Sequence, residues 1–366
     1  QSPKPQFGHV THMSEISIGL IGAGMMGQEH IQNFNLLDGV CVGAIADTHA
    51  GMRDKAAAMC PHKVQTVSDF KRLLGDPNLD AFVIATPNFH HIDVLRSALE
   101  TGKPILCEKP LCTTLDDTRE ILSRITAGKQ IFQVGMEYRF KPALADMIAR
   151  VDAGEIGRLH MLSIREHRFP FLQKVDNWNR FNRNTGGTLV EKCCHFFDLM
   201  RRIIGSEPVR VMASAGRDVN HLDENYNGDV PDILDNAYVI FDFENGARAL
   251  LDLCMFAEAS RHNEELCAIG ETGKVECLLP QNIVARGART DWQMQSDTVH
   301  VEKEILDAGY HSGGTYFQNQ AFLKAVRGEA DVIVTAEDGH RAVAMGVAAQ
   351  MAAAEARIVT MQELGL

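Results

Sequence analysis

Short apolar runs alternate with amphipathic segments along the first third of the chain. The apolar runs cover residues 16–21, 40–46, 81–86, 105–107 and 131–135. Between them, apolar residues recur at helical spacing over residues 25–36, 50–59, 90–100 and 115–125. Such an alternation is typical of βαβ units, in which helices cover both faces of a parallel sheet. The pattern therefore predicts an α/β domain built on a doubly wound parallel sheet.

After residue 135 the pattern changes to alternating apolar and polar positions, which is typical of strands with one buried face. These stretches cover residues 159–165, 209–215, 237–243, 247–256 and 265–269, and residues 244–247 have the composition of a hairpin turn. Helical spacing returns at residues 142–153, 196–204, 315–326 and 337–354. The second region therefore predicts an α+β domain with an antiparallel sheet.

The two patterns divide the chain into residues 14–135 and 136–366, and no Pro-, Gly- or Ser-rich linker separates them. We therefore expect a tight junction, which is a common place for a ligand cleft. Residues 1–13 are polar and unpatterned, and we interpret them as a flexible leader or a remnant of cloning. The length of 366 residues is itself consistent with about two domains.

The net charge and the cysteine content limit the classes of partner and the cellular compartment that we expect. Asp and Glu number 48 against 36 Lys and Arg, which gives a formal net charge of −12. Nucleic acid and anionic membranes repel such a surface, and no apolar stretch approaches the ~18 residues that span a bilayer. We therefore expect a small-molecule substrate. The nine cysteines form no CxxC pair and mostly lie in apolar runs, which favours the reducing cytoplasm.

Residues 22–27 read Gly-Ala-Gly-Met-Met-Gly and directly follow the first apolar run. In such a loop the first glycine permits a tight turn, the second lets a pyrophosphate approach the backbone, and the third allows close helix packing. The predicted cofactor-binding residues of this loop are Gly22, Gly24, Met25, Met26 and Gly27. Asp47 ends the second run and can bind the ribose hydroxyls, which favours NAD over NADP. The structural alternative is a glycine-rich turn beside an unrelated acid.

Polar residues also follow the later strands of the predicted parallel sheet, where a ligand crevice forms. We expect cofactor contacts from Thr86, Pro87, Asn88, His91, Glu108 and Lys109. A nicotinamide cation and partial desolvation would lower the pKa of Lys109 and suit it to proton transfer or to polarising a hydroxyl. The alternatives are a turn that caps the next helix and a solvated Lys109–Glu108 pair.

A further candidate lies at residues 186–195, where a Gly-Gly segment leads to Glu191 and His195. If both residues share one helix, they lie on the same face, and the carboxylate can orient the imidazole and raise its pKa. Cys193 and Cys194 precede His195, but adjacent cysteines diverge on a helix and no second Cys/His cluster has ligand spacing. We therefore expect no metal. A histidine that opens an apolar helix can also be purely structural.

Together these motifs resemble the Gfo/Idh/MocA family, which includes glucose–fructose oxidoreductase and inositol dehydrogenase. The resemblance extends from about residue 16 to residue 359 and includes Thr-Pro-Asn, Glu-Lys-Pro and a late Gly-Gly pair at 313–314. It implies an NAD-binding Rossmann domain over 14–135 and a substrate-binding, oligomerisation domain over 136–366 with a large, mostly antiparallel sheet. It also implies that Lys109 and His195 are catalytic, and that Glu191 stands where many members carry Asp.

The predicted substrate-binding residues are Arg168, Trp178, Asn182, Asp235 and His311. Residues 165–184 combine a tryptophan with Asn, Asp and Arg, which suits a polyhydroxylated ring through stacking and hydrogen bonds. The arginines also permit an anionic sugar. The resemblance adds Asp235 and His311, which match positions that often line the family's pocket. The alternatives are a polar surface loop, a strand-turn cap at Asp235 and a surface position for His311.

These observations predict an NAD-dependent oxidoreductase that oxidises a secondary hydroxyl of a sugar, glycoside or cyclitol. His195 deprotonates the hydroxyl and Lys109 stabilises the alkoxide. One alternative is a glycoside-cleaving enzyme that uses transient oxidation at C3 followed by elimination. The other is a non-catalytic NAD-binding regulator. The resemblance also implies a homodimer or homotetramer.

Overall fold

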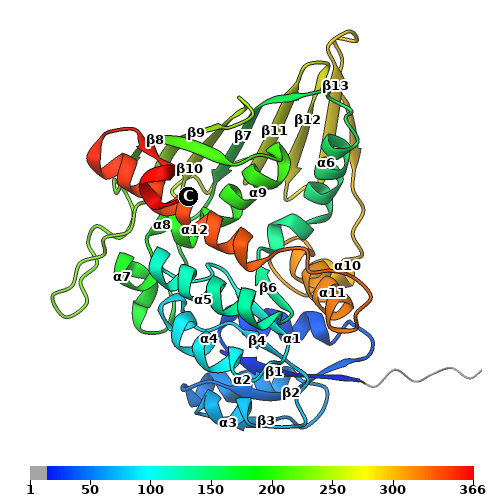
Figure 1. The fold of residues 1–366 in the computed structure, drawn as a ribbon, viewed down its shortest axis with the longest axis vertical. Coiled ribbons are helices and arrows are strands. Elements are labelled where there is room, and N and C mark those ends of the chain that lie inside the picture. The colour runs from blue at the N-terminus through cyan, green and yellow to red at the C-terminus, as the bar shows by residue number, and fades with distance from the viewer. Residues whose placement is uncertain (1–14) are drawn as a thin grey trace, which may run out of the picture.

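The computed structural model describes residues 15–366, so the expected leader at 1–13 lies outside the described residues. Two β-sheets stand one above the other with helices between them (Figure 1). No helix of the described chain is long and apolar enough to cross a membrane.

The N-terminal sheet has six parallel strands in the order β3-β2-β1-β4-β5-β6. Its strands are β1 (Ile16–Ile21), β2 (Val40–Ala46), β3 (Gln65–Val67), β4 (Ala81–Ile84), β5 (Ile105–Glu108) and β6 (Phe132–Gly135). Its helices are α1 (Met25–Phe34), α2 (Ala50–Met59), α3 (Phe70–Leu74), α4 (His91–Leu99) and α5 (Leu115–Gly128). The predicted doubly wound sheet is confirmed, and the short, mostly exposed β3 is an addition to it.

The C-terminal sheet has nine strands in the order β14-β13-β12-β11-β7-β10-β9-β8-β15. They are β7 (Leu159–His167), β8 (Pro208–Gly216), β9 (Asn236–Phe243), β10 (Arg248–Cys254), β11 (Glu264–Gly270), β12 (Gly273–Leu279), β13 (Ile283–Ala288), β14 (Gln295–Thr298) and β15 (Val359–Thr360). All neighbours are antiparallel except β7 and β10. The mostly antiparallel sheet is confirmed, although the last four strands were not predicted.

The nine-stranded sheet has one buried and one open face, because its side chains alternate along every central strand. Helices α6 (Pro142–Asp152), α9 (Cys194–Ile204) and α12 (Ala336–Glu355) cover the buried face, where their apolar residues form one cluster with the strands. The opposite face carries exposed apolar side chains, among them Met161, Tyr238 and Ile240.

Late segments of the chain return to the N-terminal sheet. Helix α11 (Gly314–Val326) places Phe322 and Leu323 in the apolar cluster under β1 and β2. The start of α12 joins the cluster on the other face, and the Val134 amide of the edge strand β6 donates to the Val334 carbonyl over 3.0 Å. A division at residue 135 therefore separates the two sheets but not the helices that pack on them.

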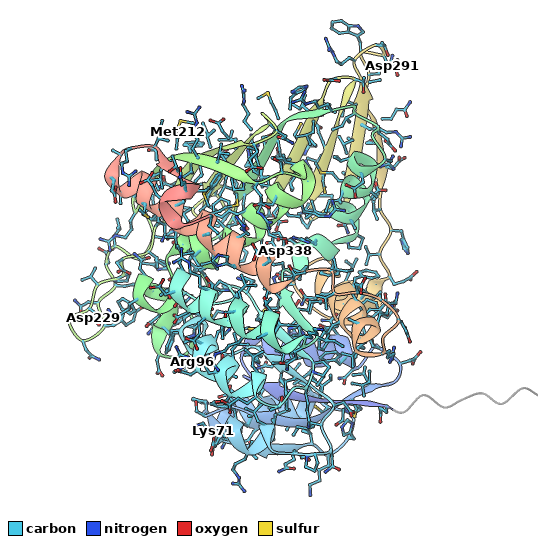
Figure 2. All side chains as sticks on the ribbon, in the orientation of Figure 1. Lys71, Arg96, Met212, Asp229, Asp291 and Asp338 are labelled. Atoms are coloured by element: carbon cyan, nitrogen blue, oxygen red, sulfur yellow. The ribbon has the colours of Figure 1, made fainter. Side chains whose placement is uncertain are left out.

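A buried ion-pair cluster ties the segment that follows β6 to helices α9 and α12. Arg139 lies in the 3-10 helix η2 (Glu137–Phe140), immediately after β6, and its guanidinium makes two hydrogen bonds of 2.5 and 2.6 Å to Asp198 of α9. The same guanidinium lies 3.1 Å from Asp338 at the start of α12, which Figure 2 labels between the halves.

We expect Arg139→Met to destabilise the protein strongly, because it leaves the Asp198 carboxylate buried without its partner. Loss of one member of a buried pair costs about 3–5 kcal/mol, whereas an exposed pair contributes about 1 kcal/mol or less. Arg183→Met, which removes the exposed pair with Asp229, is the matched control. Urea unfolding measures both variants, and equal losses would contradict the importance of the buried pair.

Candidate active site

The glycine loop has the shape that a dinucleotide requires. Gly22 adopts φ +98°, and a Cβ atom there would lie 2.4 Å from the Ala85 carbonyl oxygen. A Cβ at Gly27 would lie 2.1 Å from the Gly22 carbonyl oxygen, so both positions exclude larger residues. A Cβ at Gly24, by contrast, would meet no described atom within 4 Å. Gly24 therefore borders open space at the N-terminus of α1, where phosphate oxygens bind backbone amides.

The other features beside this loop also fit NAD. The Asp47 carboxylate at the end of β2 accepts hydrogen bonds from the Ala23 amide over 2.8 Å and the His49 amide over 2.7 Å. It thus lies beside the glycine loop, as a ribose-binding acid must. The Thr86 hydroxyl, at the end of β4, is buried without a hydrogen-bond partner in the described chain. The predicted residues Gly22, Gly24, Gly27, Asp47 and Thr86 therefore lie together after the carboxyl ends of β1, β2 and β4, where the ligand crevice of such a sheet forms.

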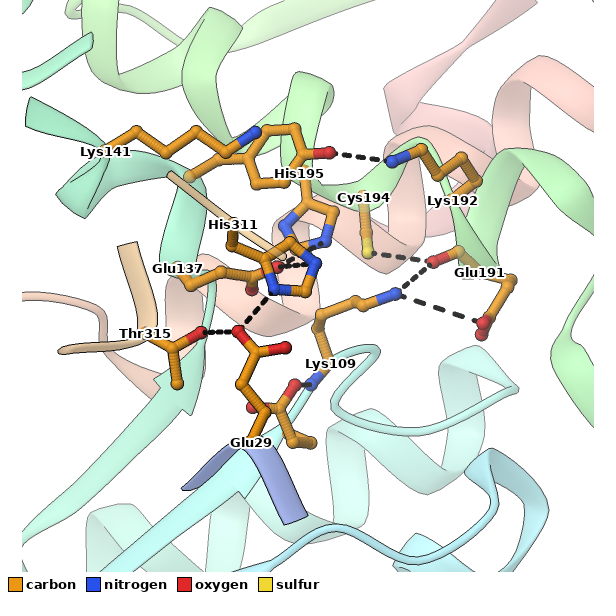
Figure 3. A network of polar contacts seen from close by, with 12 residues as sticks. Glu29, Lys109, Glu137, Lys141, Glu191, Lys192, Cys194, His195, His311 and Thr315 are labelled. Carbon is orange, nitrogen blue, oxygen red and sulfur yellow. Dashed lines mark hydrogen bonds and ion pairs between the residues drawn. The ribbon is translucent and has the colours of Figure 1, made fainter. Parts of the chain in front are cut away.

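Lys109, Glu191 and Asn88 converge at the carboxyl ends of β4 and β5, as Figure 3 shows for the first two. The Lys109 Nζ donates to the Glu191 carbonyl oxygen over 3.1 Å and lies 3.9 Å from its carboxylate. The Asn88 amide donates to the same carboxylate. Lys109 is thus a buried partner of Glu191, and the alternative of a solvated pair with Glu108 is wrong.

The charge of Lys109 differs from the expectation. Burial opposes its ammonium, but the neighbouring carboxylates, Glu191 foremost, outweigh burial and raise the pKa of Lys109 above its ordinary value. The predicted lowering invoked a bound nicotinamide cation as well as burial, and it stays a prediction for the complex with the cofactor. Lys109 is a stable cation that can polarise a hydroxyl or stabilise an alkoxide.

His195 is buried at the start of α9, and its environment differs from the predicted one. Helix α8 (Thr188–Glu191) ends before α9 begins, so Glu191 and His195 do not share a continuous helix. The carboxylate next to the His195 Nε2 is instead that of Glu137, at 3.5 Å. Burial, reinforced by the positive charges of Lys109 and Lys192, holds the pKa of His195 well below its usual value. The predicted increase is wrong, and a neutral imidazole is the form that accepts a proton.

Tyr138 fixes the plane of the His195 ring. The two rings stack with centroids 4.1 Å apart and planes 9° from parallel. The Lys141 Nζ lies 3.2 Å from the centroid of the Tyr138 ring, and the Lys192 Nζ donates to the Tyr138 hydroxyl over 2.8 Å. Each lysine is in turn neutralised by a carboxylate, Lys141 by Glu264 and Lys192 by Glu166.

His311 joins the same cluster from the loop before α11. Its Nε2 lies 3.5 Å from the Glu137 carboxylate, and its Nδ1 makes a 2.8 Å hydrogen bond with Glu29 of α1. The Thr315 hydroxyl donates to the same Glu29 oxygen over 2.7 Å. Figure 3 shows Glu29, His311, Glu137 and His195 following one another across the junction. The structure therefore places His311 in the candidate site, not on the surface.

Two residues that were predicted to contact the cofactor have partners within the protein instead. Both ring nitrogens of His91 face backbone carbonyls, those of Pro110 and Thr86, and its side chain is fully buried, so it is a structural residue. The Glu108 carboxylate is buried against His30 at 2.8 Å, which anchors the loop that carries Lys109.

Two of the predicted substrate-binding residues also form their contacts within the protein. The Asp235 carboxylate accepts the backbone amides of residues 218–220, which is the turn-capping alternative. The Asn182 side chain is exposed and bonds the Asp232 carbonyl over 2.9 Å. For these two residues the predicted substrate contact is not supported by their geometry.

The loop between β7 and α7 (Asn182–Thr185) lies against the N-terminal half. The Trp178 ring packs edge-on against Phe89, which follows Asn88 in the chain, with centroids 6.2 Å apart. Lys174 reaches Met25 at the first turn of α1, with Nζ 3.4 Å from the sulfur. The predicted Trp178 and Met25 thus both lie near the mouth of the crevice. Arg168 is turned toward the Glu166 carboxylate at 3.5 Å.

Sequence reasoning missed the carboxylates around the two histidines. Glu137 and Tyr138 follow β6 directly, so the strand-end rule that found Lys109 would also have found them. Glu29 and His30 are charged or polar residues on the buried side of the amphipathic helix α1, which was the available signal.

Taken together, the glycine loop, a buried neutral histidine and a buried ammonium define a dinucleotide-binding oxidoreductase. Residues 16–136 match the family model "Oxidoreductase family, NAD-binding Rossmann fold", and residues 148–361 match "Oxidoreductase family, C-terminal alpha/beta domain". The chain therefore belongs to the Gfo/Idh/MocA oxidoreductase family, and its N-terminal domain binds NAD.

Individual relatives agree with this assignment. The uncharacterized oxidoreductase YrbE of Bacillus subtilis is 36% identical over 65% of this chain and 67% of its own length. Inositol 2-dehydrogenase 1 of Saccharopolyspora erythraea is 28% identical over 91% of this chain and 92% of its own. The structure of levoglucosan dehydrogenase with NADH and levoglucosan has a TM-score of 0.83 at 20% identity, covering 95% and 100% of the two chains, and shows the same fold.

Two glycine substitutions separate cofactor binding from folding. We expect Gly24→Ala to keep its stability within about 0.5 kcal/mol, because its Cβ meets no described atom. It should nevertheless weaken NADH binding by about tenfold or more, because the methyl group occupies the space for a phosphate. Gly27→Ala should instead lose about 1–3 kcal/mol of stability through its backbone clash. Thermal unfolding and NADH fluorescence titration measure both, and wild-type NADH affinity in Gly24→Ala would contradict the phosphate position.

Proposed function

We propose that this protein oxidises a secondary hydroxyl of a cyclitol, sugar or glycoside with NAD as the acceptor. The observation that carries the proposal is the neutral, buried imidazole of His195 in one cluster with the ammonium of Lys109, at the crevice that binds the cofactor. A base that is uncharged at neutral pH beside a fixed cation suits removal of a proton from a weakly acidic hydroxyl.

Each residue of the site has a separate role in this reaction. NAD supplies the hydride acceptor when it is bound in the crevice. His195 takes the hydroxyl proton, and stacking on Tyr138 holds its ring in place. Lys109 stabilises the negative charge that develops on the substrate oxygen, while Glu191 and Asn88 hold Lys109 at the end of β5. Glu191 thus acts on Lys109, and its role as a direct substrate contact stays a prediction.

The charges around the pocket favour an uncharged substrate over an anionic one. Three arginines between residues 168 and 183 could bind an anion, but each faces a carboxylate: Arg168 faces Glu166, Arg180 faces Glu224, and Arg183 faces Asp229. Trp178, which packs edge-on against Phe89, offers an apolar surface for the CH face of a ring. A neutral polyol or glycoside needs no free arginine, whereas a sugar acid would have to displace one of these carboxylates to bind an arginine.

The proposal also assigns a role to each domain and includes the association of subunits into an oligomer. Residues 14–135 bind the cofactor, and residues 136–366 bind the substrate and form the interface between subunits in a reducing, cytoplasmic setting. The open face of the nine-stranded sheet supports this role, because Met161 of β7 and Tyr238 and Ile240 of β9 are exposed on the two strands that flank β10. Exposed apolar side chains gathered on one face are typical of a subunit interface.

Incubation with NAD and a panel of cyclitols, sugars and glycosides, followed by NADH absorbance, tests the activity. We expect His195→Gln to lose at least about 100-fold in kcat, because it removes the general base, while NADH binding is retained. Because the pKa of His195 is depressed, wild-type kcat/KM should stay high below pH 6.5 and fall only as His195 becomes protonated.

Other outcomes would decide against this activity. Full turnover by His195→Gln would overturn the mechanism. Bond cleavage of a glycoside without net NADH would indicate transient oxidation at C3 followed by elimination. Tight NADH binding without turnover of any substrate in the panel would indicate a regulator.

The oligomer is tested separately. We expect Tyr238→Lys to shift the protein from a dimer or tetramer toward the monomer, because it introduces a charge into the apolar face. Light scattering after size exclusion gives the mass. Trp292→Lys, at an exposed position outside this face, is the control. A monomeric wild type, or an unchanged mass of Tyr238→Lys, would contradict the proposed interface.

A further inference from the structure

The buried position of His195 raises the question of how its proton leaves. Only 2% of the His195 side chain is exposed, and oxidation of a hydroxyl delivers one proton to it in every turnover. The substrate and the cofactor themselves cover the crevice during the reaction. A path through the protein would allow His195 to be reset without opening the crevice.

A chain of acid and base groups begins at His195. Its Nε2 lies 3.5 Å from the Oε1 of Glu137, and the Nε2 of His311 lies 3.5 Å from the same oxygen. On the other side of the His311 ring, Nδ1 bonds Glu29 over 2.8 Å. The contacts therefore alternate between imidazole and carboxylate, as proton relays require.

This series of acid and base groups leads from the buried His195 to a group that is exposed to solvent. The side chains of Glu137 and Glu29 are 1% and 4% exposed, whereas that of His311 is 23% exposed. His311 is therefore the member from which a proton can reach water. The chain crosses the junction, because Glu29 belongs to α1 and His195 to α9.

We propose that Glu137 and His311 form a proton relay that carries the substrate's hydroxyl proton from His195 to solvent, an inference that rests on the proposed oxidation. His195 accepts the proton and passes one to the Glu137 carboxylate. Glu137 passes it to Nε2 of His311 as His311 releases its Nδ1 proton to Glu29 or to water. One proton enters and one leaves, and no electrons move along the relay.

The electrostatics of the members fit this order. Burial raises the pKa of Glu137, so its carboxylate is a better proton acceptor than an exposed one. Burial opposes the charge of His311, but Glu137 and Glu29 outweigh burial and raise its pKa, so Nε2 of the neutral ring accepts a proton from Glu137 more readily than a solvated imidazole would. Lys109 and Lys141 face the same cluster and keep His195 from retaining the proton.

The alternative is that Glu137 and His311 only position His195. The Thr315 hydroxyl bound to Glu29 and the Tyr138 ring stacked on His195 show that the cluster is also well packed. A positioning role and a relay differ in one respect: a small base in solution can replace a missing relay group, but it cannot restore a lost position.

His311→Gln is the decisive variant, because the amide can still bond Glu29 but cannot transfer a proton. In weakly buffered solution we expect kcat to fall by about tenfold, with an increased solvent isotope effect. Added imidazole should restore kcat in a saturable manner and leave the wild type unchanged. The control is His221→Gln, which removes a buried histidine that lies 2.7 Å from Glu224 outside the cluster.

Two results would overturn the relay: wild-type kcat in His311→Gln, or a reduced kcat that imidazole does not raise. If the wild type oxidises no substrate, the proposed function fails, and nitrogen-15 NMR of labelled histidines still tests the relay. We expect Glu137→Gln to shift the imidazole resonances of both His195 and His311. Resonances of His195 that respond neither to Glu137→Gln nor to His311→Gln would overturn it.

Discussion

The charges buried between the two sheets must neutralise one another, and much of the architecture follows from this constraint. Water cannot solvate these groups, so each ammonium or guanidinium requires a carboxylate nearby. The pairs come from different parts of the chain: Arg139 with Asp198, Lys141 with Glu264, and Lys109 with Glu191. Each pair therefore fixes how one segment lies against another, and together they align the strand ends with α9.

The same constraint separates the charge states of the catalytic groups. Carboxylates outnumber cations around Lys109, so the lysine keeps its proton. Cations dominate around His195, so the imidazole is kept neutral. One compact site thus holds a protonated lysine next to a neutral imidazole. The stacked Tyr138 contributes by filling one side of the His195 ring with an aromatic surface that admits no water.

The parallel sheet and the glycine loop were predictable because both are local signals. Apolar runs of strand length mark β1, β2 and β4, and the glycine loop follows β1 directly, where Gly27 is required by contact with the Gly22 carbonyl oxygen. The strand β3 was not predicted, because it is three residues long and mostly exposed. The edge strand β14 was also not predicted, because it is exposed throughout and shows no alternation of apolar and polar residues.

The partners within the site were far less predictable, because they depend on distant parts of the chain. The spacing of Glu191 and His195 suggested a pair, but the turn between α8 and α9 breaks that geometry and Glu137 takes the place beside His195. Likewise, the arginines of the β7–α7 loop suggested a basic pocket until the carboxylates opposite them were known. Residue types revealed the chemistry, whereas the contacts required the fold.

The return of α11 and α12 to the N-terminal sheet has a consequence for how the protein is made. A ribosome releases β1 to β6 long before residues 314–342, which supply Phe322, Leu323 and Val334 to that half. Until then, part of the cofactor domain's apolar surface and the free edge of β6 have no cover. The domain that is first in sequence is therefore among the last to be completed, because its apolar core is closed only after nearly the whole chain has been synthesised.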